Sequence, residues 1–126
     1  MSGPMVPAVQ TAADDLRAEF EVNSVAPLMV LQGLWPLLPK PAGPKVIMMT
    51  SSVGCITFPE LCGGSYGPSK AALNWITRAL HLQNEESGLV AVALHPGWVQ
   101  TDMGEQSARD WGHAHQPPKT GIHRGC

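Results

Sequence analysis

Val46-Ile47-Met48-Met49 is the first of two short apolar runs, and Leu89-Val90-Ala91-Val92-Ala93-Leu94 is the second. Between them, apolar residues recur at helical spacing over residues 66–86. Continuous apolar runs of this length are typical of strands that are buried on both faces. A strand, a helix and a second strand in this order form a βαβ unit, in which the two strands run parallel. The pattern therefore predicts an α/β fold built on a parallel sheet.

A longer helical pattern precedes the first strand and covers residues 14–38. Thr11 is a candidate N-cap, and two aspartates in the first turn suit the positive end of the helix dipole. Pro27 lies inside this pattern, lacks an N–H group and crowds the preceding turn. We therefore expect a kink just after Asn23.

The composition excludes several classes of partner. The 126 residues suffice for one domain with a core. A net charge of -2 gives no electrostatic reason to bind nucleic acid or an anionic membrane surface. The longest apolar run, residues 26–38, is interrupted and too short to span a bilayer. Neither nucleic acid nor a membrane is an expected partner.

Cysteine and histidine spacing gives no sign of a metal site or a disulfide framework. The three cysteines are an odd number without metal-like pairing: Cys55, Cys62 and Cys126. His113 and His115 have no third ligand nearby in the sequence, so no metal is expected. No basic segment followed by an apolar run opens the chain. We therefore expect a reducing compartment and a cytoplasmic protein.

Tyr66 and Lys70 are the strongest candidates for acid/base chemistry. Four residues are about one helical turn, so the two side chains share a helix face. An ammonium beside a phenol favours the phenolate, and we expect Lys70 to lower the pKa of Tyr66. Ligands of open parallel sheets bind beyond the carboxyl ends of the strands. Here these ends carry Ser51-Ser52 and Pro96-Gly97, so the candidate groups converge on one edge.

Four motifs follow one another along the chain: Asn23, Thr50-Ser51-Ser52-Val53-Gly54, Tyr66-Gly67-Pro68-Ser69-Lys70 and Pro96-Gly97-Trp98-Val99-Gln100-Thr101. In this order they resemble the second half of a short-chain dehydrogenase/reductase. The segment from Leu94 to Gly104 is similar to the fungal norsolorinic acid ketoreductase-like branch. The resemblance implies a partial Rossmann-like, doubly wound parallel sheet with three αβα layers, and an NAD(P)-dependent oxidoreductase that reduces ketones or other carbonyls by hydride transfer.

The resemblance also implies a role for each motif residue. Tyr66 is the expected general acid, Lys70 lowers its pKa and binds the nicotinamide ribose, and Asn23 holds a water that relays protons. Ser52 is the preferred carbonyl-binding serine, with Ser51 left open because it lies three residues before Gly54. The expected cofactor is NADP or NAD, with NADP slightly favoured, and the substrate is a small carbonyl or alcohol. The residues expected to bind the cofactor are Tyr66, Lys70, Pro96, Gly97, Val99 and Thr101.

The resemblance is incomplete, because no glycine-rich dinucleotide turn precedes Asn23. We expect residues 1–126 to be an incomplete domain that lacks the first half of the sheet, with an irregular tail over residues 105–126. A truncated form with impaired cofactor binding is the corresponding expectation. An alternative is a non-catalytic remnant that acts as an association module. In either case we expect a homo-oligomer through helices 14–38 and 66–86.

A remote alternative is a serine hydrolase. Gly63-Gly64-Ser65-Tyr66-Gly67 matches the G-x-S-x-G elbow, with Asp102 and His113 downstream in the hydrolase order. An elbow needs a buried strand that runs directly into it, whereas residues 59–62 are a poor strand end.

Overall fold

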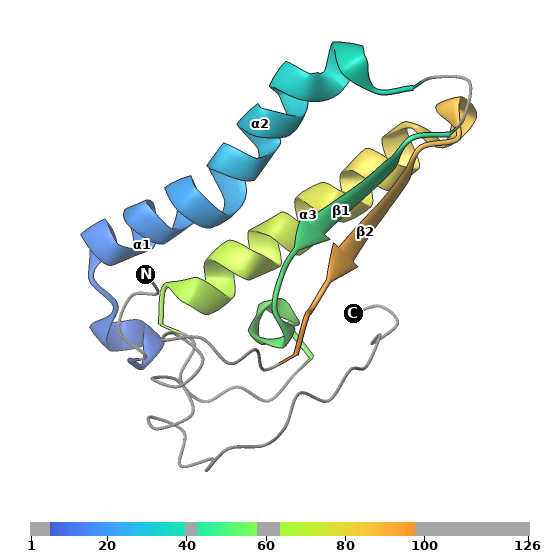
Figure 1. The fold of residues 1–126 in the computed structure, drawn as a ribbon. Coiled ribbons are helices and arrows are strands. Elements are labelled where there is room, and N and C mark those ends of the chain that lie inside the picture. The colour runs from blue at the N-terminus through green and yellow to red at the C-terminus, as the bar shows by residue number, and fades with distance from the viewer. Residues whose placement is uncertain (1–5, 40–42, 58–63, 98–126) are drawn as a thin grey trace.

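The computed structural model describes residues 6–39, 43–57 and 64–97 (Figure 1). A long helical rod leads into a two-stranded sheet with a third helix against it. The rod consists, in order, of a 3-10 turn (Ala8–Gln10), α1 (Ala13–Phe20), a π-helical segment (Glu21–Val25), α2 (Ala26–Leu34) and a 3-10 turn (Trp35–Leu37).

The predicted interruption of the first helix is confirmed and takes the form of a widened turn. At the end of the π-helical segment the Ala26 N–H donates to the carbonyl of Glu21, five residues earlier. Pro27 has no N–H to offer the carbonyl of Asn23, so the usual pattern cannot continue through this point. Single π-helical turns occur frequently at functional sites.

The predicted N-cap of this helix is wrong by one position. Ala12 is the N-cap residue of α1, and no side chain caps the helix. The Thr11 hydroxyl donates instead to the Pro7 carbonyl at 3.4 Å, because Thr11 already belongs to the end of the preceding 3-10 turn.

The predicted parallel strand–helix–strand unit is confirmed. β1 (Lys45–Met49) pairs in parallel with β2 (Val90–Leu94), in register from Lys45 opposite Val90 to Met49 opposite Leu94. Between them run α3 (Tyr66–Gln83) and a 3-10 turn (Glu85–Ser87). Both strands end at one edge of the sheet, which brings the segments after Met49 and Leu94 together.

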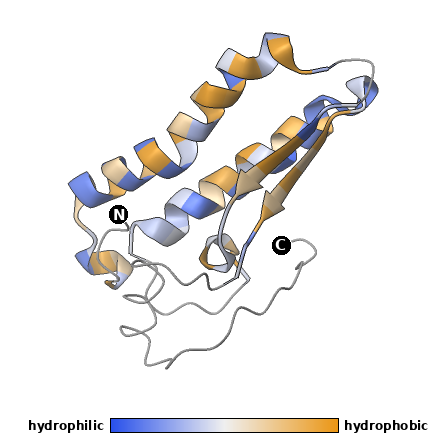
Figure 2. Ribbon diagram, in the orientation of Figure 1, coloured by the Kyte–Doolittle hydropathy of each residue, from blue (hydrophilic) through white to orange (hydrophobic). Residues whose placement is uncertain are grey.

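One face of the sheet carries the core. A buried cluster joins α2, α3, β1 and the residue just before β2: Leu31, Val46, Met48, Leu73 and Leu89. The opposite face is apolar but open, and Ile47 is 62% exposed there. Figure 2 shows how strongly apolar the strands are. The prediction of strands buried on both faces is therefore wrong for the described residues, which supply one helical layer.

This difference has a simple physical cause. A continuous apolar run indicates that both faces of a strand are apolar, but it does not indicate which part of a protein covers each face. The α/β class with a parallel sheet is confirmed.

Cys55 is disulfide-bonded, contrary to the expectation of no disulfide framework. Cys62 and Cys126 both lie outside the described residues. A disulfide depends on the separation of two Cα atoms in the fold, which an odd cysteine count does not reveal. The cysteine count therefore no longer supports a cytoplasmic localisation, which stays a prediction. Within the described ranges, no helix is long and apolar enough to cross a membrane.

Candidate active site

The segment after β1 is held tightly against the beginning of α3. Ser51 caps a 3-10 turn (Ser52–Gly54) by accepting the Val53 N–H at 3.4 Å. A β-carbon on Gly54 would lie 2.7 Å from the Lys70 carbonyl carbon and 2.8 Å from the Ala71 nitrogen. Real β-carbons essentially never make non-bonded contacts this short, so only glycine permits the approach. Gly54 therefore sets how closely the two serines approach α3.

A polar clamp, formed by Thr50, Asn74 and the Gly54 carbonyl, also fixes this turn. The Thr50 hydroxyl at the end of β1 donates to Asn74 Oδ1 at 2.6 Å. Asn74 Nδ2 in turn donates to the Gly54 carbonyl at 3.1 Å. The sequence analysis assigned no role to this pair, although Asn74 follows Lys70 by one helical turn and so shares its face. The clamp connects β1, the serine-bearing turn and α3.

Tyr66 and Lys70 occupy one face of α3, as their spacing predicts. Lys70 Nζ lies 5.6 Å from the centre of the Tyr66 ring and donates to the Met49 carbonyl at 3.0 Å. Burial lowers the pKa of Lys70, and the negative charge of Glu19 partly offsets this effect. The ammonium is thus anchored at the carboxyl end of β1, beside the tyrosine.

The pKa of Tyr66 is raised, whereas the sequence analysis expected Lys70 to lower it. Burial is the largest cause, because it disfavours the charged phenolate. A hydrogen bond from Ser51 lowers this pKa, and the charge of Glu19 raises it further. The Lys70 ammonium lies over the ring and donates to the Met49 carbonyl. The phenol is therefore held in its protonated form.

The geometry distinguishes the two candidate serines. Ser51 is the hydrogen-bonding partner of the Tyr66 side chain. Ser52 is the first residue of the 3-10 turn, and among the described residues no hydrogen bond joins it to Tyr66. Ser51 also has the three-residue spacing to Gly54 noted above. The sequence analysis preferred Ser52, whereas in the structure Ser51 is the better placed of the two beside the phenol.

Asn23 lies in the π-helical segment and faces the first turn of α3. Its Nδ2 donates to Glu19 and to Ser69 Oγ, the second at 3.1 Å. Ser69 Oγ donates onward to the Tyr66 carbonyl at 2.7 Å. Ser24 strengthens the junction, because its hydroxyl donates to the Ser69 carbonyl at 2.7 Å. The structure thus brings Asn23 into the network that supports Tyr66.

Glu19 is a member of this network that the sequence analysis missed. It is 5% exposed, which is unusual for a carboxylate. Its position four residues before Asn23 was the available signal, because that spacing places both side chains on one helix face.

The end of β2 forms the other side of the edge. The Thr50 N–H donates to the Leu94 carbonyl at 2.8 Å, which holds the two strand ends together. Pro96 and Gly97 follow at this edge, and Gly97 has a positive φ of 78°. Val99 and Thr101, the other expected cofactor residues, lie outside the described residues.

The structure gives the hydrolase alternative no support. Ser65 is 1% exposed at the beginning of α3, and its hydroxyl has no hydrogen-bond partner within the described ranges. A nucleophilic serine needs a base within hydrogen-bonding reach and access to a substrate. Asp102 and His113 lie outside the described residues. Groups of three or more metal-ligating side chains are absent from the part of the chain that the structure describes.

Comparisons with known proteins identify the family of this chain. Residues 3–111 match the family described as short chain dehydrogenase. This chain belongs to that family. A short-chain dehydrogenase of Pyricularia oryzae is 36% identical over 115 residues, covering 88% of this chain and 45% of that protein. A norsolorinic acid ketoreductase of Dothistroma septosporum is 30% identical over 123 residues, covering 93% of this chain and 45% of that protein.

Two solved structures extend the similarity to the fold. The carbonyl reductase Sniffer of Drosophila melanogaster superposes with a TM-score of 0.74 at 30% identity, covering 82% of this chain and 47% of Sniffer. An NADPH-bound carbonyl reductase from chicken fatty liver gives a TM-score of 0.71 at 34% identity, covering 80% of this chain and 44% of that one. The chain therefore spans about half the length of the relatives that it matches; for the Pyricularia protein the matched share is 45%.

Proposed function

We propose that this short-chain dehydrogenase carries the proton-transfer residues of an NAD(P)-dependent carbonyl reductase. The observation that carries the proposal is the position of Tyr66, which lies between Ser51 and Lys70 with its pKa raised by burial. A phenol that stays protonated is the form that donates a proton to a carbonyl oxygen. The similarity to two carbonyl reductases supports this direction of the reaction.

Each residue then has a defined part in the reduction. A nicotinamide cofactor supplies the hydride for this chemistry. Tyr66 donates its proton to the substrate oxygen, while the Ser51 hydroxyl donates a hydrogen bond to the same oxygen and polarises the carbonyl. Lys70 stabilises the phenolate that remains until a proton returns. Asn23, supported by Glu19 and Ser69, occupies the place from which a water passes that proton.

The described residues fit the nicotinamide half of such a cofactor. Tyr66 and Lys70 offer hydroxyl and ammonium groups to a ribose, and both are only partly buried at the carboxyl edge of the sheet. Pro96 and Gly97 lie at the same edge beyond β2 and are suited to line the ring. We favour NADP slightly over NAD, in line with the NADPH-bound carbonyl reductase that this chain resembles.

We further propose that these 126 residues bind the cofactor weakly by themselves. Dinucleotide folds hold the pyrophosphate at a glycine-rich turn that opens a helix, and no such turn precedes Asn23. Titration calorimetry with NADPH tests this directly. A dissociation constant of about 1 μM, worth roughly 8 kcal/mol, contradicts the proposal.

The reductase activity is tested by following NADPH oxidation with a panel of ketones at a cofactor concentration high enough to offset weak binding. Replacing Tyr66 with Phe removes one hydroxyl and no other group. We expect Tyr66→Phe to lower the turnover number by about 100- to 10,000-fold, the usual contribution of a general acid. A rate equal to that of the unmodified chain excludes Tyr66 as the acid.

We also propose that the chain self-associates through α2 and α3. Both helices expose large apolar side chains, and Trp75 on α3 is 68% exposed. Burying such residues between two copies is favourable by about 25 cal/mol per Å² of apolar surface. Light scattering of the unmodified chain and of Trp75→Glu tests the interface. A monomeric unmodified chain contradicts the proposal, and so does an oligomer that Trp75→Glu leaves intact.

A further inference from the structure

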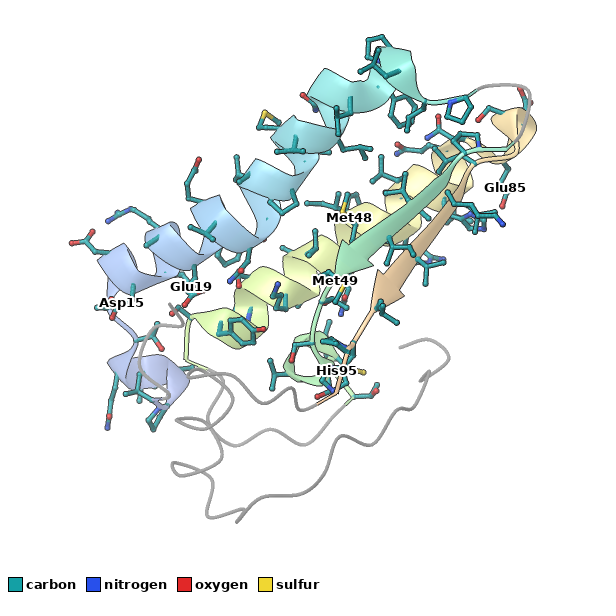
Figure 3. All side chains as sticks on the ribbon, in the orientation of Figure 1. Asp15, Glu19, Met48, Met49, Glu85 and His95 are labelled. Atoms are coloured by element: carbon teal, nitrogen blue, oxygen red, sulfur yellow. The ribbon has the colours of Figure 1, made fainter. Side chains whose placement is uncertain are left out.

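Glu19 is a carboxylate in an unusual place. It is 5% exposed, and Figure 3 shows it on the side of α1 that faces the beginning of α3. Removing a carboxylate from water is costly unless hydrogen bonds or charges compensate for the lost hydration. A position of this kind therefore requires partners in the fold, and the partners indicate what the residue does.

The first partner is the Asn23 amide. Asn23 Nδ2 donates to Glu19 Oε2 one helical turn away, and the same nitrogen lies 3.1 Å from Ser69 Oγ. The amide is therefore held by α1 on one side and by α3 on the other. Since Ser69 also donates to the carbonyl of Tyr66, Glu19 is connected to the first turn of α3 through two intermediate side chains.

The second effect of Glu19 is electrostatic. Its negative charge raises the pKa of both Tyr66 and Lys70, which are the titratable groups that face it from α3. Of the other charged residues on its own helical rod, Arg17 is exposed and paired with Asp14 at 2.7 Å. Asp15 is partly exposed one turn before Glu19, and Glu21 is exposed.

We propose that Glu19 is a positioning residue of this site, which orients the Asn23 amide and places a fixed negative charge beside Tyr66 and Lys70. The charge favours the protonated form of Tyr66 and partly offsets the effect of burial on the pKa of Lys70. Both effects favour the protonation states that carbonyl reduction needs. The catalytic meaning of this inference rests on the proposed reductase function, whereas the electrostatic coupling does not.

The chain allows a direct test because Tyr66 is its only tyrosine. Isotopically labelled tyrosine therefore gives a single ring resonance, and its chemical shift against pH reports the pKa of Tyr66 alone. We expect Glu19→Gln to lower this pKa, because the substitution removes the charge and retains the side-chain volume. Glu21→Gln is the matched control: it removes an exposed charge two residues away and is expected to leave the pKa unchanged. An equal pKa in Glu19→Gln and the unmodified chain overturns the inference.

Circular dichroism shows whether Glu19→Gln folds. If it does not fold, Glu19→Asp serves as the second variant. Glu19→Asp retains the charge and withdraws it by one methylene, so we expect a Tyr66 pKa below that of the unmodified chain. An unchanged value there also overturns the inference. Neither measurement needs substrate or cofactor. A chain without reductase activity whose Tyr66 pKa falls in Glu19→Gln refutes the proposed function and supports the role of Glu19.

Discussion

Gly54 and Lys70 approach each other so closely that a β-carbon on Gly54 would lie 2.9 Å from the Lys70 β-carbon. Gly54→Ala must therefore push the serine-bearing turn away from α3. Introducing a group into such a tightly packed contact typically costs about 1–3 kcal/mol. We expect urea unfolding of Gly54→Ala to show a loss of this size.

Gly33→Ala is the matched control for that substitution. A β-carbon on Gly33 would meet no atom within 4 Å, and the residue lies in α2. Alanine is favoured over glycine inside a helix by about 0.5–1 kcal/mol, so Gly33→Ala is expected to be neutral or stabilising. Equal stabilities for the two variants contradict the close approach between Gly54 and α3.

The clamp of Asn74 with Thr50 and Gly54 leads to a second prediction. Asn74→Ala removes the side-chain donor to the Gly54 carbonyl, whereas the Thr50 hydroxyl retains a longer bond to the Lys70 carbonyl at 3.5 Å. A buried carbonyl that stays unpaired costs about 1–3 kcal/mol, so urea unfolding is expected to show a loss in this range. Ser87→Ala, which removes an exposed hydroxyl donor to the Asn84 carbonyl, is expected to cost much less.

A double-mutant cycle separates the clamp from general packing. Because Thr50→Val removes the hydroxyl that donates to Asn74, the losses of the two single variants are expected to add to more than the loss in the double variant. Strict additivity means that the two side chains do not interact.

The raised pKa of Tyr66 predicts a dependence of stability on alkaline pH. A folded-state pKa above the ordinary tyrosine value of 10.0 means that the folded chain keeps a proton that the unfolded chain loses. This contribution is fully present below pH 10.0 and is lost as the pH rises through the folded-state value. We therefore expect the free energy of unfolding of Tyr66→Phe to fall less steeply at alkaline pH than that of the unmodified chain.

Lys70 is expected to act in the opposite sense. Its folded-state pKa lies below the ordinary lysine value of 10.5, so the folded chain gives up this proton before the unfolded chain does. Between the folded-state pKa and 10.5, loss of this proton adds to the free energy of unfolding as the pH rises. Lys70→Met lacks this gain, so its free energy of unfolding should fall more steeply as the pH rises toward 10.5. Urea titrations at several alkaline pH values compare the three chains. Parallel curves for all three contradict both shifts.

Features that depend on a residue itself or on a short run of residues could be predicted from the sequence. Pro27 lacks an N–H group whatever surrounds it, so a disturbed helix near Asn23 could be predicted. The two apolar runs predicted the parallel strands. By contrast, the rise in the pKa of Tyr66 depends on burial by distant segments. The presence of Glu19 beside it follows from the packing of α1 on α3. Neither effect is visible in the spacing of Tyr66 and Lys70.

Ser51 and Ser52 could not be distinguished by sequence, because the choice depends on how a single 3-10 turn orients two adjacent side chains. The structure makes them separable by experiment. Since the Ser51 hydrogen bond lowers the pKa of Tyr66, Ser51→Ala is expected to raise that pKa further, and Ser52→Ala to leave it unchanged. The single tyrosine resonance measures both. In the NADPH oxidation assay, loss of a hydrogen-bond donor to the substrate oxygen should lower turnover by about 100- to 1,000-fold for Ser51→Ala alone. A larger effect from Ser52→Ala in both measurements would return the carbonyl-binding role to Ser52.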